Sequence, residues 1–202
     1  MKIVHVEKLV STGSFARSRE WKRVRDGLHE AIRAVDWPPG TGKFTIYPQS
    51  GKRRGEGNGV KPIKNECIAK LCEQGWRAEI ALDILGTANP GDLDAVFQAK
   101  AGAVAMEWET GNISSSHRAL NKLSIGLMRG SLVGATLVVP SRRLYKWLTD
   151  RIGNFQELQP YLELWKSIPS ENGVLEIVVI EQDDESLDVP RIPKGTDGRA
   201  RR

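Results

Sequence analysis

Hydrophobic residues recur along this chain with two spacings, every three to four residues in some segments and every second residue in others. The first spacing holds between residues 17 and 35 and predicts an amphipathic helix that ends before Pro38. It returns after Pro62, which suits a first helical position, and predicts a second helix that reaches about Glu73. Both helices should turn an apolar stripe towards a common core.

The second half of the chain carries three further helix signals. Ser114 or a neighbouring serine is expected to cap a helix that runs to about Arg129, and Gly130 is expected to end it. Ser141 is expected to cap the next helix, and a short one follows around 158–166.

Strand patterns fall between these helices, and two of them are close enough to form a hairpin. Residues 93–97 and 103–109 are joined through Lys100 and Gly102, which favours an antiparallel pair within a mixed sheet. The other strand candidates are 43–48, 77–85, 134–140 and 174–180. The order of elements predicts an α/β fold in which helices sandwich a central sheet.

Length and composition are those of one globular domain spanning 1–202. The chain has 202 residues, of which 40% are hydrophobic and 27% charged, enough for a sizeable core. No apolar run is long enough to cross a membrane, and the N-terminus does not resemble a signal peptide, so a cytoplasmic protein is expected. Cys67 and Cys72 are then expected to be reduced, buried and structural.

The positive charge is concentrated in two places. The net charge of +5 is modest. However, cations cluster between Lys52 and Lys64, and the segment 190–202 forms a basic C-terminal arm with five cations after Pro190. Both clusters could contact phosphates, and both could equally be solvated loops.

Acidic residues gather on the predicted hairpin. Side chains alternate across a strand, so Glu107 and Glu109 should emerge on one face and Trp108 on the other. Asp94 can reach the same face from the paired strand, and Glu79 is a possible fourth carboxylate. Carboxylates this close repel one another unless a cation neutralises them, and Mg²⁺ suits an all-oxygen site used on phosphates. A plain solvent-facing pair of glutamates is the alternative.

Hydrogen-bond donors follow the acidic strand directly. The run from Thr110 to Arg118 leads into the N-terminus of a helix, which is an end that suits a phosphate or the edge of a DNA groove. Asn and Arg can also read bases in the major groove. Helix capping by Ser114 and a structural role for His117 are the simpler interpretations of those two residues.

The segment "MEWETGNISSSHRALNKL" resembles the active-site strand and recognition helix of BamHI/OkrAI-type type II restriction endonucleases. "NGVKPIKNECIAKL", "GDLDAVF", "YKWLTDRIGNFQELQPYLELW" and "IPKGTDGRARR" are similar to further blocks of that family in the same order, from about Lys43 to the C-terminus. The resemblance implies a restriction-endonuclease-like PD-(D/E)XK fold. It also implies Mg²⁺-dependent hydrolysis of double-stranded DNA at a palindrome, GGATCC, with Mn²⁺ as an expected substitute for Mg²⁺.

The resemblance also assigns roles to the acidic residues. Asp94, Glu107 and Glu109 match the metal ligands, together with the backbone carbonyl of Trp108, and Glu79 matches a further active-site carboxylate. Many nucleases of this fold carry lysine at the last motif position, whereas this family has glutamate. Glu109 is therefore the candidate general base.

DNA contacts are implied in the same way. Asn112, Ser114 and Arg118 match readout positions at a helix start, and an Asp-Arg pair matches a second readout segment. Lys61 matches a DNA-proximal position, and two tail residues match an arm placed in the minor groove. The Asp-Arg pair and the tail residues are Asp150, Arg151, Gly195 and Asp197.

Reading a palindrome implies a homodimer, because a two-fold protein matches a two-fold site. The helix 115–129 and the segment after Asn154 are expected to form the interface, with Arg129 and Glu163 in charge pairs. The chain has no nucleotide-binding glycine motif, and neither a nucleotide cofactor nor a membrane partner is expected. Two alternatives are a less specific DNA repair or processing nuclease and a non-catalytic DNA-binding protein on the same scaffold.

Overall fold

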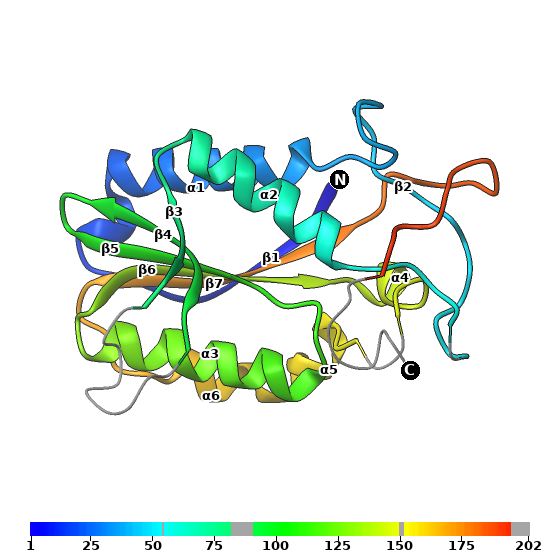
Figure 1. The fold of residues 1–202 in the computed structure, drawn as a ribbon. Coiled ribbons are helices and arrows are strands. Elements are labelled where there is room, and N and C mark those ends of the chain that lie inside the picture. Colours follow the sequence, from blue (N-terminus) through cyan, green and yellow to red (C-terminus); the bar gives the residue numbers. More distant parts are fainter. Residues whose placement is uncertain (54, 82–90, 150–151, 195–202) are drawn as a thin grey trace.

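A computed structural model of the chain describes residues 1–53, 55–81, 91–149 and 152–194. A six-stranded sheet runs through the centre of the molecule in the order β1-β7-β6-β5-β4-β3 (Figure 1). Its strands are β1 (Lys2–Thr12), β3 (Arg77–Ile80), β4 (Leu93–Ala99), β5 (Gly102–Trp108), β6 (Leu132–Pro140) and β7 (Gly173–Glu181). β5, β6 and β7 are mutually parallel, whereas β4 pairs with both β3 and β5 in antiparallel fashion and β1 pairs with β7 in the same way.

Helices cover both faces of this sheet (Figure 1). One layer holds α1 (Arg19–Ala34) and α2 (Lys61–Glu73), and the other holds α3 (Ile113–Met128), α5 (Phe155–Leu158) and α6 (Leu162–Lys166). Because strand side chains alternate, the sheet supplies one set of apolar residues to each layer and builds two separate cores. The predicted sandwich of helices about a mixed sheet is confirmed.

Shorter elements complete the chain. The 3-10 turns are η1 (Phe15–Arg17) and η2 (Gln159–Tyr161), and α4 (Arg142–Tyr145) is one turn of helix after β6. β2 (Thr45–Ile46) and β8 (Asp184–Glu185) form a small parallel sheet of their own. In the part of the chain that is described, no helix has both the length and the apolar character needed to cross a bilayer.

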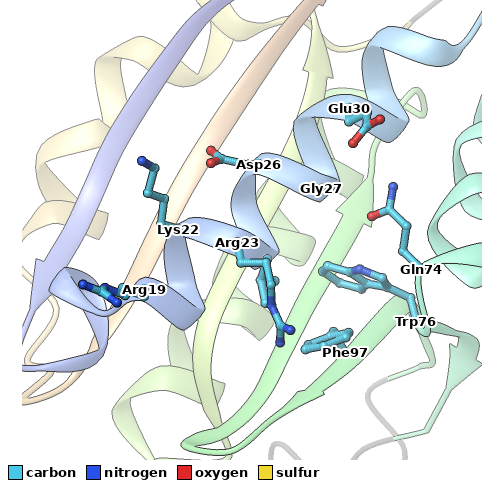
Figure 2. Close-up of a pocket in the computed structure, with 10 residues that line it drawn as sticks. Arg19, Lys22, Arg23, Asp26, Gly27, Glu30, Gln74, Trp76 and Phe97 are labelled. Atoms are coloured by element: carbon cyan, nitrogen blue, oxygen red, sulfur yellow. The ribbon is translucent and has the colours of Figure 1, made fainter.

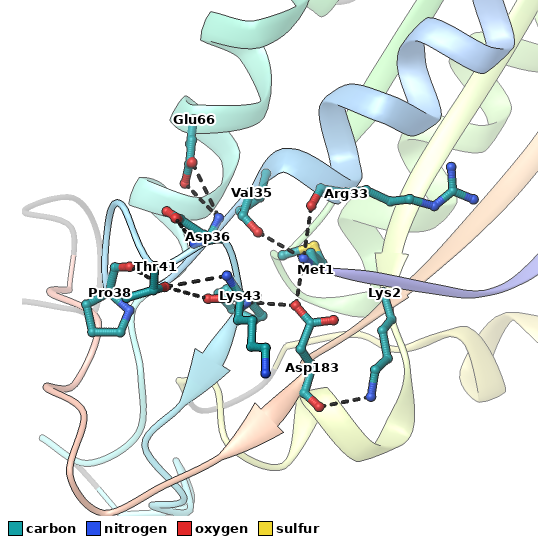
Figure 3. A network of polar contacts seen from close by, with 12 residues as sticks. Met1, Lys2, Arg33, Val35, Asp36, Pro38, Thr41, Lys43, Glu66 and Asp183 are labelled. Atoms are coloured by element: carbon teal, nitrogen blue, oxygen red, sulfur yellow. Dashed lines mark hydrogen bonds and ion pairs between the residues drawn. The ribbon is translucent and has the colours of Figure 1, made fainter.

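A polar network ties the small sheet to the start of β1 (Figure 3). One carboxylate oxygen of Asp183 accepts a hydrogen bond from the Phe44 N–H at 2.7 Å and pairs with the amine of Met1 at 2.9 Å. In the same network Asp36 accepts from the Gly42 N–H at 2.7 Å. These bonds fix the connection between α1 and β2, which leads on to the loop before α2.

Two local expectations were wrong. Asn112, not Ser114, caps α3, because the Asn112 side chain accepts from the Ser115 N–H at 3.1 Å. Cys67 is buried as expected, but Cys72 is exposed. It lies near the end of α2, away from the buried side that Ile63, Cys67 and Leu71 form.

Candidate active site

A cavity of about 680 Å³ opens at the end of the central sheet where β5 stops and α3 begins. It brings together residues that are widely separated in the sequence but were all predicted to belong to the site. The predicted residues that line it are Lys61, Glu79, Asp94, Glu107, Trp108, Glu109 and Arg118.

Asp94 is held at two atoms on the antiparallel pair β4–β5. One carboxylate oxygen accepts from the Trp108 backbone N–H at 2.8 Å, and the other forms an ion pair with the Lys64 ammonium. The Trp108 ring packs into the core on the α1–α2 side, as strand alternation predicts. The hairpin therefore places Asp94 next to the end of the acidic strand, and α2 supplies a cation to it.

Glu107 points towards the helical layer that contains α3 and is almost fully buried, with 4% of its surface exposed. Its carboxylate forms an ion pair with Lys122 of α3, and the same ammonium donates to the Asp92 carbonyl at 2.9 Å. Burial raises the pKa of Glu107 to about 7, with Asp94 and Glu109 adding to the rise and Lys122 opposing it. The carboxylate is thus short of positive charge even with a lysine beside it.

Glu109 follows the last residue of β5 and is half-buried. Burial raises the pKa of this carboxyl above its usual range, and the Asp94 carboxylate adds to the rise. Lys64, Arg118 and the Gly111 backbone N–H oppose it. The Glu109 carboxylate is therefore partly desolvated, with the Asp94 carboxylate and the cations Lys64 and Arg118 near it.

Glu79 comes from the edge strand β3. The register of the β3–β4 pair runs from Ala78 opposite Ala95 to Ile80 opposite Leu93, so Glu79 falls opposite Asp94. Its φ of 51° is in the left-handed region, which is unfavourable for a residue other than glycine. The residue lines the cavity from its outer side and is exposed to solvent.

The donor set of this cavity fits a hard divalent cation. Asp94, Glu107 and Glu109 offer only oxygen ligands, and burial, with repulsion between the carboxylates as a smaller cause, raises the pKa of both glutamates, an effect that a bound cation would oppose. In the described residues, no three acidic, histidine or cysteine side chains converge closely enough to form a ready-made ion site. Asp94 is instead paired with Lys64 of α2 and Glu107 with Lys122 of α3, which lie in opposite helical layers.

The start of α3 presents polar groups beside these carboxylates. Asn112 and Ser114 are exposed, and Arg118 is exposed and lines the cavity one turn further along. His117 is different, because its ring packs against Tyr161 at 4.7 Å and Trp165 at 5.3 Å between centroids. Its packing agrees with the structural interpretation of that histidine.

Lys61, at the first position of α2, is exposed at the rim of the cavity. Four predicted DNA-contacting residues lie outside the described residues. They are Asp150, Arg151, Gly195 and Asp197.

Lys64 and Lys122 line the cavity but were not predicted as site residues, and Lys64 was noted only as part of the basic cluster. Lys64 stands three residues after Lys61 on α2, and Lys122 stands four residues after Arg118 on α3. These spacings put each lysine on the same helical face as a predicted site residue. That spacing is the signal by which they could have been found.

A second cavity, of about 610 Å³, lies along α1 (Figure 2). Side chains of Arg19, Arg23, Gln74, Trp76 and Phe97 surround it. None of the residues that line it belongs to the predicted acidic or DNA-contacting set. The acidic cavity is therefore the candidate active site.

Comparison with known proteins relates the whole chain to restriction enzymes. A family model described as Restriction endonuclease BamHI matches residues 1–199. The type II restriction enzyme OkrAI of Oceanobacter kriegii is 45% identical over 200 residues, which are 99% of each chain. The type II restriction enzyme BamHI of Bacillus amyloliquefaciens is 37% identical over 173 residues, covering 82% of this chain and 77% of that one.

A solved structure shares the fold. The restriction endonuclease BglII, crystallised in complex with a DNA 16-mer, superposes with a TM-score of 0.60 over 91% of this chain and 79% of its own. The sequence identity in that comparison is 12%, so the likeness concerns the fold alone. It confirms the restriction-endonuclease-like architecture expected from the sequence.

Proposed function

Because the chain belongs to the BamHI family of type II restriction endonucleases, we propose that it cleaves double-stranded DNA at the palindrome GGATCC with Mg²⁺ as cofactor. It would act in the cytoplasm, as a homodimer. The observation that carries the proposal is the acidic cavity, in which Asp94, Glu107 and Glu109 lie beside Arg118 and the polar start of α3.

Asp94, Glu107, Glu109 and the Trp108 carbonyl are the groups that would hold the metal. When bound, Mg²⁺ supplies a Lewis acid for a phosphoryl oxygen and lowers the pKa of a coordinated water, and Mn²⁺ can take the same ligands. A bound metal would compete with Lys64 for Asp94 and with Lys122 for Glu107. Both ammonium groups line the cavity, where they could balance the charge of an entering phosphodiester.

Glu109 is the proposed general base. Its raised pKa makes it a better proton acceptor than an ordinary glutamate, provided that it remains ionised. Arg118 and Lys64 favour the ionised form. A water molecule between the Glu109 carboxylate and the scissile phosphate would therefore give its proton to a Glu109 oxygen. Glu79 lines the outer side of the same cavity and is proposed as a further active-site carboxylate, by resemblance to the family.

Sequence recognition is proposed to come from the helix start and from the chain segments beside it. Arg118 can donate to guanine, and the amide of Asn112 can donate while its oxygen caps α3. Ser114 is exposed for a similar contact, and Lys61 is placed for a phosphate. Asp150, Arg151, Gly195 and Asp197 complete the proposed set, by resemblance to the family.

A dimer is favoured by apolar side chains exposed at the far end of α3 and on η2–α6. Met128, Tyr161 and Leu164 are 49%, 50% and 63% exposed. These residues lie on the helices for which the family resemblance implies an interface, and exposed apolar side chains there would be covered by a partner chain. A two-fold pair of chains would place one acidic cavity against each strand of a palindrome.

Plasmid digestion tests the proposal. The protein is incubated with a plasmid of known sequence in Mg²⁺, then in chelator, and the fragment ends are mapped. Discrete fragments that end at GGATCC and disappear on chelation are expected. Discrete ends elsewhere would overturn GGATCC as the recognition sequence. A smear would favour the less specific processing nuclease. Tight binding without cleavage would favour the non-catalytic DNA-binding protein.

A further inference from the structure

Asn58 is fully buried although it lies in a glycine-rich loop, and every polar group it carries is engaged. Its side-chain amide donates to the Tyr47 carbonyl and to the Trp147 carbonyl, both at 2.8 Å. Its side-chain oxygen accepts from the Ile192 N–H at 3.1 Å. A buried Asn with all of these bonds made is a strong local constraint, because breaking any of them leaves a polar group unsatisfied in the interior.

The backbone of Asn58 continues the same junction. Its N–H donates to the Trp147 carbonyl at 2.9 Å, and its own carbonyl accepts from the Thr149 N–H at 3.0 Å. Next to it, the Gly59 N–H donates to the Ile192 carbonyl at 2.9 Å. Three segments far apart in the sequence therefore meet at one residue: the loop 50–59, the segment 147–149 and the segment 192–194.

Glycines allow this close approach. A Cβ on Gly51 would lie 1.8 Å from the Leu148 carbonyl oxygen, and a Cβ on Gly59 would lie 1.9 Å from the Pro193 carbonyl oxygen. Neither position can carry a side chain without moving the backbone. Glycine at these two positions therefore permits the close contact of the loop with segments 147–149 and 192–194.

Two segments of the junction lead to predicted DNA contacts. Thr149 precedes the Asp150–Arg151 pair, and Gly153 on its other side donates from its backbone N–H to the Gly111 carbonyl at 2.7 Å, beside the acidic strand. Lys194 is the last described residue of the C-terminal arm and precedes Gly195, and its ammonium donates to the Glu56 carbonyl at 2.5 Å. The loop itself carries exposed Lys52 and Arg53.

We propose that Asn58 is a positioning residue for DNA sequence recognition, which fixes the chain before Asp150–Arg151 and the start of the C-terminal arm relative to each other. The inference rests on the proposed function, because it assigns those segments to DNA. Asn58 does not line the acidic cavity. Its contribution is to hold segments 147–149 and 192–194 together before DNA binds, which lowers the cost in affinity of ordering them separately.

A double-mutant cycle tests the coupling. Four proteins are compared: wild type, Asn58→Ala, a truncation after Lys194, and the two changes combined. The truncation keeps Ile192, which is buried and bonded to Asn58. Affinity is measured in chelator for a short GGATCC duplex, or for the site that plasmid digestion maps, and for a scrambled duplex.

The specificity ratio, which is the affinity for the site duplex divided by that for the scrambled duplex, should fall about tenfold in each single variant. In the combined variant it should fall by less than the product of the two single losses, because the truncation already removes the residues after Lys194 and leaves only the effect of Asn58 on the chain before Asp150. Cationic arm residues also attract any DNA, but that effect is common to both duplexes and cancels in the ratio. A ratio unchanged in Asn58→Ala, or losses that multiply in the combined variant, would overturn the inference.

A measurement without DNA distinguishes a local loss of positioning from a loss of stability in the whole fold. Hydrogen exchange at the Thr149 and Ile192 amides should accelerate in Asn58→Ala while the amides of β6 and β7 stay protected. Unchanged exchange at both amides would overturn the inference. The matched control is Asn172→Ala, which removes a side-chain acceptor for the Phe15 N–H at 2.8 Å near the β1–α1 connection and should leave the ratio unchanged.

Lys194→Met keeps the test decisive if Asn58→Ala does not fold. It removes the bond to the Glu56 carbonyl and one positive charge, at a half-buried position. The lost charge affects both duplexes alike, so the specificity ratio should fall only through the lost bond, by a smaller factor than in Asn58→Ala. No change in that variant would then count against the inference. Failure of the proposed function would be seen earlier and separately, as the loss of discrete plasmid fragments from the wild-type protein.

Discussion

The buried Glu107 should make the metal-free protein less stable as the pH rises, and replacing it with glutamine should remove that dependence. Its pKa is raised in the folded chain from an ordinary 4.5 to about 7. The folded state therefore binds more protons than the unfolded state between these values. The stabilisation is complete below the unfolded pKa and is lost as the pH rises through the folded one.

The magnitude follows from the size of the shift. At about 1.4 kcal/mol per pH unit, a rise from 4.5 to about 7 corresponds to about 3 kcal/mol, of which roughly 2 to 3 kcal/mol develops between about pH 5 and about pH 8. Glu107→Gln keeps an acceptor for Lys122 but cannot ionise. Loss of the negative charge beside Lys122 should change the stability of Glu107→Gln equally at about pH 5 and about pH 8. The change in stability between these two pH values therefore isolates the ionisation of Glu107.

Urea unfolding in chelator at about pH 5 and about pH 8 measures this difference. Wild type should lose stability across the interval and Glu107→Gln should lose much less, while Glu171→Gln, at an exposed position before β7, should follow wild type. Adding Mg²⁺ at the higher pH should restore the stability of wild type and not that of the variant, because a ligand stabilises only a state that binds it. Parallel stability curves for wild type and Glu107→Gln would refute this explanation of the site.

Three further outcomes are expected. Glu109→Lys should lower cleavage about a hundredfold or more and spare specific binding in chelator, since it removes the proposed base; unchanged turnover would contradict that role. Arg118→Ala should cost about 1 to 3 kcal/mol of discrimination at a G·C pair, and an equal loss on every DNA sequence would make it a phosphate contact. Leu164→Asp should raise the dimer dissociation constant at least about tenfold in sedimentation, unlike the control Leu187→Asp on an equally exposed leucine, and an unaffected dimer would move the interface elsewhere.

The parts of the fold that followed from the sequence are those whose signals are local. The β4–β5 hairpin and α2 are marked by short-range patterns, a tight connection in one and a proline at the helix start in the other. The hairpin alone was enough to predict that Asp94, Glu107 and Glu109 share a site, and all three line one cavity. Their predicted chemical roles stay predictions.

The parts that did not follow depend on packing between distant segments. β1 received no assignment because it is an edge strand, and its charged residues on a largely exposed surface break the alternation. The partners of Asp94 and Glu107 depend on how α2 and α3 dock on opposite faces of the sheet. Asn58 in a glycine-rich loop is typical of an exposed turn, and its burial arises only when segments 147–149 and 192–194 close over it.

Lys64 and Lys122 explain how so acidic an edge can exist before any substrate arrives. Lys64 comes from α2 in one helical layer, and Lys122 comes from α3 in the other. Each ion pair partly offsets the negative charge of its carboxylate, so the repulsion between Asp94 and Glu107 is reduced. Buried ion pairs of this kind stabilise a fold no better than neutral groups of the same shape. Replacing the Glu107–Lys122 pair with glutamine and methionine should therefore leave the folded chain as stable or more so, while cleavage is lost. That outcome would indicate that the pair contributes to binding a cation and a phosphate and not to the stability of the fold.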